Sequence, residues 1–389
     1  MQFAVALSKQ TDTDIAASDV AANIQAQLGG RSIDLLCVFF SAHHAEQAEQ
    51  LAKVLTDRLH PTQLLGCSGE GVIAGAEELE TTPALTVWAA VLPDVTLYPL
   101  HSSYSPTQDQ FHLTGWPAPG VEDASFLLLA DPFTTPIQDI LGVLEDRYPG
   151  TQAIGGLAGG GQEAGMNRLI LNDQILDSGL VGVRISGAVD IRPVISQGCR
   201  LIGERFVVTK AERNLIHELG GEPALGRLQA VFDSLPEEDR PRASRAVHLG
   251  IVMDEHRNRF EQGDFLIRNL LGADQTTGAV AVGEVVQEGQ TVQFHLRDAT
   301  SASEEFNALL IADHQRHRHP PLGALMFSCC GRGQGLFGKP NHDAGTATAR
   351  LGSIPLAGFF AQGEIGPVGR RNFLHGYTAS LALFAERDR

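Results

Sequence analysis

The sequence is short of basic residues. Its 389 residues hold 29 Lys and Arg against 46 Asp and Glu, which gives a formal net charge of −17 at pH 7. A chain of that sign repels phosphate backbones and anionic lipids at separations inside the Debye length. We therefore expect neither nucleic acid nor a membrane surface among the partners.

Long apolar runs, an export signal and disulfide patterns are also missing. No run reaches the roughly 18 apolar residues of a membrane-spanning helix. The chain starts without a basic residue and with only a short apolar run, so we expect no secretion signal. Cysteine occurs five times, an odd number, with no C-x-x-C pair, which favours a reduced cytoplasmic compartment over a disulfide framework.

The common catalytic and cofactor motifs are absent. The glycine runs 66–71 and 155–161 carry no Walker lysine, and run 155–161 lacks the G-x-G-x-x-G spacing of a dinucleotide-binding loop. There is no G-x-S-x-G nucleophile elbow. His314, His317 and His319 with Asp313 could form a metal site, since His314 and His317 share a helix face. His317 and His319 do not share one and Pro320-Pro321 follows at once, so a solvated helix end is favoured. We expect no cofactor and no metal.

What is present is a recurring order of strand, helix and strand. The apolar run 33–40 predicts a buried strand, and the apolar spacing over 43–59 predicts the following helix. The order recurs with a strand at 125–130 and a helix at 135–148, and again between 325–327 and 355–358. We interpret this as an internal repeat in an α/β fold, in which repeated strand-helix-strand units carry glycine-rich loops at their strand ends. The strand-to-glycine separations are similar: 29 residues from Cys37 to Gly66, 27 from Leu128 to Gly155 and 31 from Phe327 to Gly358.

Chain length predicts two domains, because a single hydrophobic core stops growing at roughly 250–300 residues. We place them at 1–190 and 191–389. Beyond the second repeated unit the sequence changes to short predicted strands separated by turn residues and a charged, proline-rich loop. In that region, Asp190–Gly203 is predicted as a connector and Pro236–Arg242 as a loop. Further helices are predicted over 13–28, 223–233 and 303–316.

The strongest candidate site follows the strands of the third unit. Glycines in the loop Cys329–Gly333 allow a sharp turn, and Arg332 there can grip a carboxylate in a bidentate manner. Glu364 follows the other strand and can accept the ammonium group of an amino-acid ligand. The alternative is that Arg332 and Glu364 pair with each other as a structural link. The ligand-binding residues that we predict here are Cys329, Gly331, Arg332, Gly333, Gly363 and Glu364.

Four other residues carry weaker signals. Arg268 and Arg297 lie at the ends of predicted strands and add cations to an acidic chain, although surface ion pairs would explain them equally well. Cys67 and Ser68 lie in the first glycine run and could form a pocket wall. The alternative for that run is tight turns and close packing.

Several motifs occur in a fixed order over nearly the whole chain. They are Gly66-Cys67-Ser68-x-x-Gly71-Val72-Ile73, Val194–Gly203, Val208-Thr209-Lys210 with Glu218-Leu219, Phe265–Asn269, Arg297-Asp298, Cys329-x-Gly331-Arg332-Gly333 and Gly358-Phe359-Phe360-x-x-Gly363-Glu364-Ile365-Gly366-Pro367. In this order they resemble the N-terminal and C-terminal halves of the FIST family, and the last two motifs are the specific ones. The resemblance implies a sensory module that binds small ligands, amino acids among them, and that accompanies signal-transduction domains in bacteria. We expect no room for an output domain in this chain, unlike the fused examples, so the resemblance implies sensing or binding but leaves the signalling step without a visible agent. Besides the small ligand, we expect a signalling protein among the partners.

We therefore expect a cytoplasmic protein that binds a small polar ligand, an amino acid or a related small carboxylate, in intracellular signal transduction. Two alternatives stay open. The first is an adaptor that binds only other proteins. The second is a cysteine-dependent enzyme, in which Cys329 would meet His342 or His375 and an acid such as Asp343. We favour a protein that is not an enzyme, because nothing in the sequence places those residues together.

Overall fold

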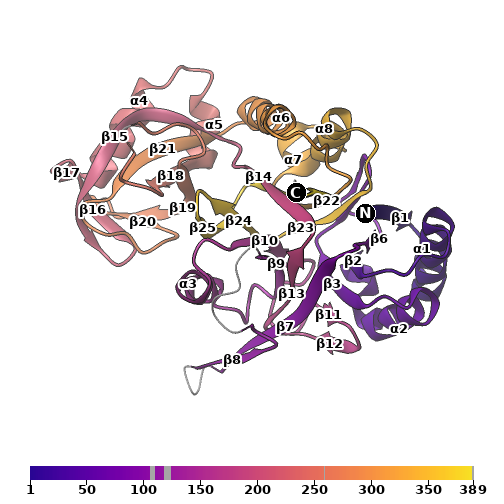
Figure 1. Ribbon diagram of the computed structural model, residues 1–389. Helices are drawn as coiled ribbons and strands as arrows, with labels where there is room; N and C mark the ends of the chain where they lie inside the picture. The colour runs from indigo at the N-terminus through magenta and orange to yellow at the C-terminus, as the bar shows by residue number, and fades with distance from the viewer. Residues whose placement is uncertain (106–109, 118–123, 258, 388–389) are drawn as a thin grey trace. The chain divides into compact units, whose positions relative to one another are not determined.

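The computed structural model describes residues 1–105, 110–117, 124–257 and 259–387 (Figure 1). The chain forms two compact units. The first consists of 1–195, 307–374 and 378–389, and the second of 196–306 and 375–377. The predicted α/β class with two units is confirmed. The third strand-helix-strand copy lies in the same compact unit as the first two copies, although it follows the second unit in the sequence.

The described part of the first unit holds three sheets. The first has the order β1 (Gln2–Ser8), β6 (Leu85–Val91), β2 (Leu35–Ser41), β3 (Gln63–Gly69), β11 (Leu169–Leu171) and β12 (Gln174–Leu176). The second has the order β25 (Arg371–His375), β24 (Glu364–Val368), β10 (Gln152–Leu157), β9 (Ala124–Ala130), β13 (Leu180–Gly187), β7 (Val95–Ser105) and β8 (Gln110–Thr114). The third has the order β14 (Val189–Ser196), β26 (Ala379–Glu386), β22 (Gly323–Cys329), β23 (Leu356–Ala361), β4 (Val72–Ala74) and β5 (Glu77–Leu79).

At the centre of each sheet lies one parallel strand pair, joined through helices as the sequence pattern predicts. Helix α2 (Ala48–Leu59) joins β2 to β3, and α3 (Ile137–Arg147) joins β9 to β10. Two short helices, α7 (Gly333–Phe337) and α8 (His342–Leu351), join β22 to β23. The internal repeat is therefore a repeat of three-dimensional structure.

One glycine occupies the same place in each copy. Gly66 lies opposite Val38, Gly155 opposite Leu128, and Gly358 opposite Met326. A Cβ atom on these glycines would lie 2.4, 1.8 and 1.8 Å from the facing carbonyl oxygen, so a larger residue would push the strands apart. The prediction of loops at 66–71 and 155–161 is therefore wrong at Gly66 and Gly155, which lie inside β3 and β10, where the paired strands approach too closely for a side chain.

The three copies exchange hairpins in a cycle. After the first copy, β4–β5 pairs with β23 of the third; after the second, β11–β12 pairs with β3 of the first; after the third, β24–β25 pairs with β10 of the second. Equivalent backbone hydrogen bonds mark each junction. They are Ser68 N–H to Arg168 O at 2.9 Å, Leu157 N–H to Gly363 O at 2.8 Å, and Phe360 N–H to Gly71 O at 2.9 Å. Each sheet is therefore completed by a segment of another copy, which explains why the copies form one unit.

The inner faces of the three sheets share one apolar core. It includes Phe39 from the first copy and Phe327 and Phe359 from the third, whose rings lie within contact distance of one another. On the outer face of the first sheet pack α2 and α1 (Thr13–Leu28), the helix that was predicted over the same residues (Figure 1). A 3-10 helix, Ala42–Gln47, precedes α2 where one continuous helix was predicted.

The second unit holds one sheet and two helices among its described residues. The strand order is β15 (Cys199–Glu212), β21 (Thr291–Arg297), β18 (Val247–Val252), β19 (Phe265–Ala273), β20 (Val280–Val282), β16 (Leu215–Leu219) and β17 (Glu222–Pro223). The helices are α4 (Ala224–Ser234) and α5 (Arg240–Ala246), and α6 (Ala299–Arg316) runs from the second unit into the first.

Two local predictions fail in this region. Asp190–Gly203 is not a connector, because most of it lies in β14 and β15. Arg192 and Arg200 inside these strands form ion pairs with Asp313 and Asp239, which are distant in the sequence and could not be predicted from the local polarity of the segment. The predicted loop Pro236–Arg242 ends inside α5. No helix of the described chain is long and apolar enough to cross a membrane.

Candidate functional site

The candidate site lies at the carboxyl end of the parallel pair β22–β23. Cys329 is the last residue of β22 and is buried, whereas the next residue, Cys330, is exposed. The chain then turns, and Arg332 N–H donates to Cys329 O at 2.8 Å. Gly333 has φ +60°, and a Cβ atom on it would lie 2.6 Å from the carboxylate of Glu80. The loop thus needs glycine at 333, both for its backbone conformation and for its contact.

Arg332 is fully buried and forms a bidentate ion pair with Asp343. Its Nε and Nη2 lie 2.6 and 3.0 Å from the two carboxylate oxygens. Ser328 Oγ donates to the same carboxylate at 3.2 Å, and His342 Nδ1 lies 3.0 Å from Oδ1. Burial alone would raise the pKa of Asp343, but the Arg332 charge and the bonds from His342 and Arg332 hold it well below its usual range. The structure thus pairs Arg332 with Asp343, and the Arg332 charge also acts on Glu364.

Glu364 is fully buried at the start of β24, opposite Gly156 of β10. Its Oε2 accepts a hydrogen bond from Thr378 N–H at 3.2 Å. Among the described residues, its Oε1 has no hydrogen-bond partner. Burial raises the pKa of Glu364 well above its usual value; Cys329 adds to the shift, and Thr378 and Arg332 oppose it.

Thr378 joins the two strand ends. Its carbonyl accepts from Cys329 N–H at 2.9 Å, while its own N–H donates to Glu364. Cys329 and Arg332 both influence the pKa of Glu364, so the three side chains lie in one neighbourhood. A buried carboxyl that keeps its proton beside a thiol can both donate and accept a hydrogen bond.

Comparison with known proteins identifies the fold. The FIST N domain model matches residues 34–222 and the FIST C domain model matches residues 224–367. The chain belongs to the FIST family. An uncharacterized protein of Mycobacterium tuberculosis (strain ATCC 25618 / H37Rv) is 42% identical over 386 residues, which are 99% of this chain and 100% of that protein. An uncharacterized protein of Mycobacterium bovis (strain ATCC BAA-935 / AF2122/97) is 39% identical over 386 residues, 99% of each chain.

FIST domains are associated with sensing in signal transduction. The two FIST matches meet near residue 223, inside the second compact unit, so the family halves and the compact units divide this chain differently. The sequence-based domains 1–190 and 191–389 stay a prediction.

The four weaker candidates, Cys67, Ser68, Arg268 and Arg297, are buried or contact other residues of this FIST protein. Cys67 and Ser68 are buried inside β3; burial raises the pKa of Cys67, and Ser68 Oγ accepts from Arg168 N–H at 3.1 Å. Arg268 pairs with Glu284 at 3.0 Å within the second unit.

Arg297, also in the second unit, ends β21. Its guanidinium lies 4.6 Å from the centre of the Tyr377 ring. The contacts of Arg268 and Arg297 account for a structural role, and ligand binding by either stays a prediction.

The sequence analysis did not predict two glutamates, Glu78 and Glu80, that contact the helices after Cys329. The hairpin β4–β5 comes from the first copy, and Glu78 Oε1 accepts from Ala344 N–H of α8 at 2.7 Å. Glu80 accepts from Gln334 N–H of α7 at 2.8 Å. Burial raises the pKa of Glu78 to about 7, and the Asp343 charge adds to the shift. Strands of three residues show no readable periodicity, so only the hairpin exchange could have revealed these partners.

Proposed function

We propose that this FIST protein is a cytoplasmic sensor that binds a small polar ligand, an amino acid or a related small carboxylate, at the Cys329–Glu364 site. The observation that carries the proposal is Glu364, a fully buried carboxyl group whose Oε1 has no hydrogen-bond partner among the described residues. Buried polar groups in proteins are rarely left unpaired, and exceptions concentrate at functional sites.

The chemistry of Glu364 favours a ligand that brings a hydrogen-bond donor or a positive charge. An ammonium group beside Glu364 would favour the ionised carboxylate and form a charge-assisted hydrogen bond. In this proposal Arg332 is a positioning residue, since Asp343 already engages its guanidinium in a bidentate pair. The remaining ligand contacts that we propose come from Cys329 and from the glycine backbone at 331, 333 and 363.

The hairpin β24–β25 is the element that would transmit the signal. It begins with Glu364 and completes the sheet of the second copy, so a change at Glu364 acts on two copies together. A ligand that binds one position of this hairpin more tightly shifts the equilibrium by its differential affinity. A signalling protein would read that shift.

A thermal-shift screen of the purified protein against amino acids and small carboxylates tests this function. A ligand at a hundredfold excess over its Kd stabilises the folded state by about 2.7 kcal/mol, which raises the melting temperature measurably. Glu364→Gln should abolish the shift. The matched control is Glu77→Gln, which alters an exposed glutamate paired with Lys9 and should keep the shift. A flat screen, or an unchanged response of Glu364→Gln, would refute the proposal.

A further inference from the structure

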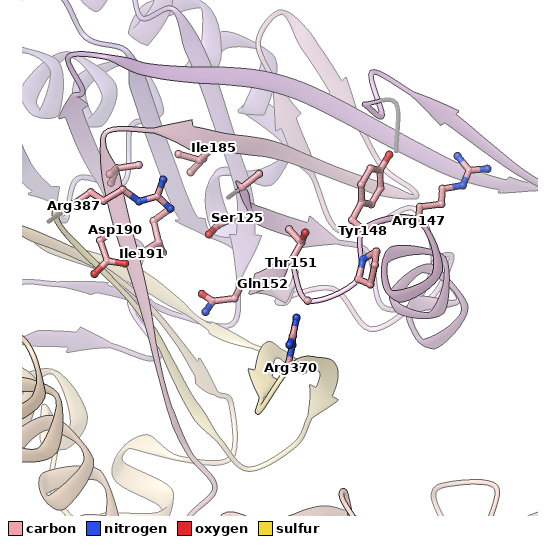
Figure 2. Close-up of a pocket in the computed structure, with 14 residues that line it drawn as sticks. Ser125, Arg147, Tyr148, Thr151, Gln152, Ile185, Asp190, Ile191, Arg370 and Arg387 are labelled. Carbon is pink, nitrogen blue, oxygen red and sulfur yellow. The ribbon is translucent and has the colours of Figure 1, made fainter. Parts of the chain in front are cut away.

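A second feature of the first unit is a polar cavity of about 540 Å³. It lies at the amino-terminal end of the parallel pair β9–β10. Figure 2 shows Ser125, Thr151 and Gln152 between Arg370 on one side and Arg387 with Asp190 on another. Such a volume is within the range of small-molecule sites. None of these residues belongs to the Cys329–Glu364 site.

The cavity is particular to the second copy. Ser125 lies three residues before Leu128, and the equivalent positions in the other copies are Leu35 and Gly323. Leu35 is fully buried in the shared core. At Gly323 the side chain of Phe3 fills the space, since a Cβ atom there would lie 2.7 Å from its Cγ. The same place is thus apolar and filled in the first and third copies, and polar and open in the second copy.

Gln152 shows the same contrast. Its equivalent in the first copy is Gln63, whose Oε1 accepts from Asn172 Nδ2 at 3.0 Å. In the second copy the corresponding amide, Asn372 Nδ2, donates instead to Thr151 O at 2.8 Å. Gln152 Oε1 is consequently buried with no hydrogen-bond partner among the described residues.

The structure also holds Arg370 at this cavity. Asn372 Oδ1 accepts from Ala153 N–H at 2.8 Å, which fixes the β24–β25 turn against the start of β10. Gly150 has φ +78°, and a Cβ atom on it would lie 3.1 Å from Arg370 Nη2, so glycine leaves room for the guanidinium. Within the described chain, Arg370 has no ion-pair partner, in contrast to its neighbour Arg371, which pairs with Glu145 at 2.9 Å.

We propose that this cavity binds a small hydroxylated anion. Its phosphate or carboxylate group would be held by Arg370, since a guanidinium matches either group with two parallel hydrogen bonds. A hydroxyl group of the ligand would donate to Gln152 Oε1 and so supply the bond that Asn172 supplies in the first copy. Ser125 and Thr151 offer further hydroxyl groups between these two contacts.

Calorimetric titration of the full chain with glycerol 3-phosphate, malate and inorganic phosphate tests the proposal. Arg370→Ala should weaken binding of the preferred probe by about tenfold or more, as expected for loss of a charge-assisted contact. Arg371→Ala is the matched control: it removes the same charge one residue away, from an exposed ion pair, and should change affinity by less than about twofold. Gln152→Leu should weaken the hydroxylated probes and leave inorganic phosphate unaffected.

Preference for glycerol 3-phosphate assigns a phosphate ester, and preference for malate assigns a hydroxycarboxylate. Absence of binding by all three probes, or equal weakening by Arg370→Ala and Arg371→Ala, would overturn the proposal. Anion binding that persists in a Glu364→Gln variant lacking the amino-acid response would separate this proposal from the sensor proposal.

Discussion

The buried ion pair between Arg332 and Asp343 makes a quantitative prediction. Both side chains are 1% exposed or less, and the two hydrogen bonds between them measure 2.6 and 3.0 Å. Removing one member leaves the other charge buried without compensation, which typically costs 3–5 kcal/mol. We therefore expect Arg332→Met to lower the free energy of unfolding by about 3–5 kcal/mol. The double variant Arg332→Met/Asp343→Leu should recover most of that loss.

Urea denaturation of the single and double variants measures this directly. Arg350→Met, at an exposed position of α8, is the matched control and should cost less than about 1 kcal/mol. If Arg332→Met lost less than about 1 kcal/mol, the pair would not hold the loop together. A stable Arg332→Met variant that lost ligand response would instead return Arg332 to the direct ligand contact predicted from the sequence.

Three further outcomes follow. Burial raises the folded-state pKa of Glu78 from 4.5 to about 7, so the folded state binds the proton more tightly. Stability should therefore fall by about 3 kcal/mol as pH rises through that window, and Glu78→Gln should remove this fall in denaturation curves. Gly358→Ala should cost more than about 2 kcal/mol because of the backbone clash, whereas Gly345→Ala, in a helix with open space around it, should be neutral or stabilising in the same assay. In the native protein, iodoacetamide should label Cys330, the exposed cysteine, before any other, as peptide mass mapping would show.

Local patterns predicted much of the first unit. Helix Thr13–Leu28 has a capping aspartate, Asp12, and apolar spacing, and it forms over the predicted residues. The strand-to-glycine spacing led to the three copies because the close approach of paired strands requires glycine at one fixed place in each. These signals come from residues close together in the sequence, so contacts between distant segments do not change them.

The exchange of hairpins could not be predicted. The hairpins concerned include strands of three residues, and the sheet that each one joins is decided by contacts between distant copies. The same reason hid the partner of Arg332. Asp343 lies 11 residues from Arg332 in the sequence, and only the positions of α7 and α8 bring the two side chains together. Cys329 and Glu364 could be predicted to lie near each other because each is at the end of a predicted strand, and parallel strands end at one edge; their role in ligand binding stays a prediction.

The central claim is that a ligand binds at Glu364, and proton release on binding tests it most directly. The ligand that emerges from the screen would be titrated at a mildly acidic pH in buffers of different ionisation enthalpy. Burial raises the pKa of Glu364 and so favours its protonated form in the free protein, whereas a ligand ammonium group would favour the ionised carboxylate and release of the proton. We predict release of about one proton per ligand by the wild-type protein and none by any residual binding of Glu364→Gln. Binding without proton release in the wild type, or equal release in both proteins, would contradict the claim.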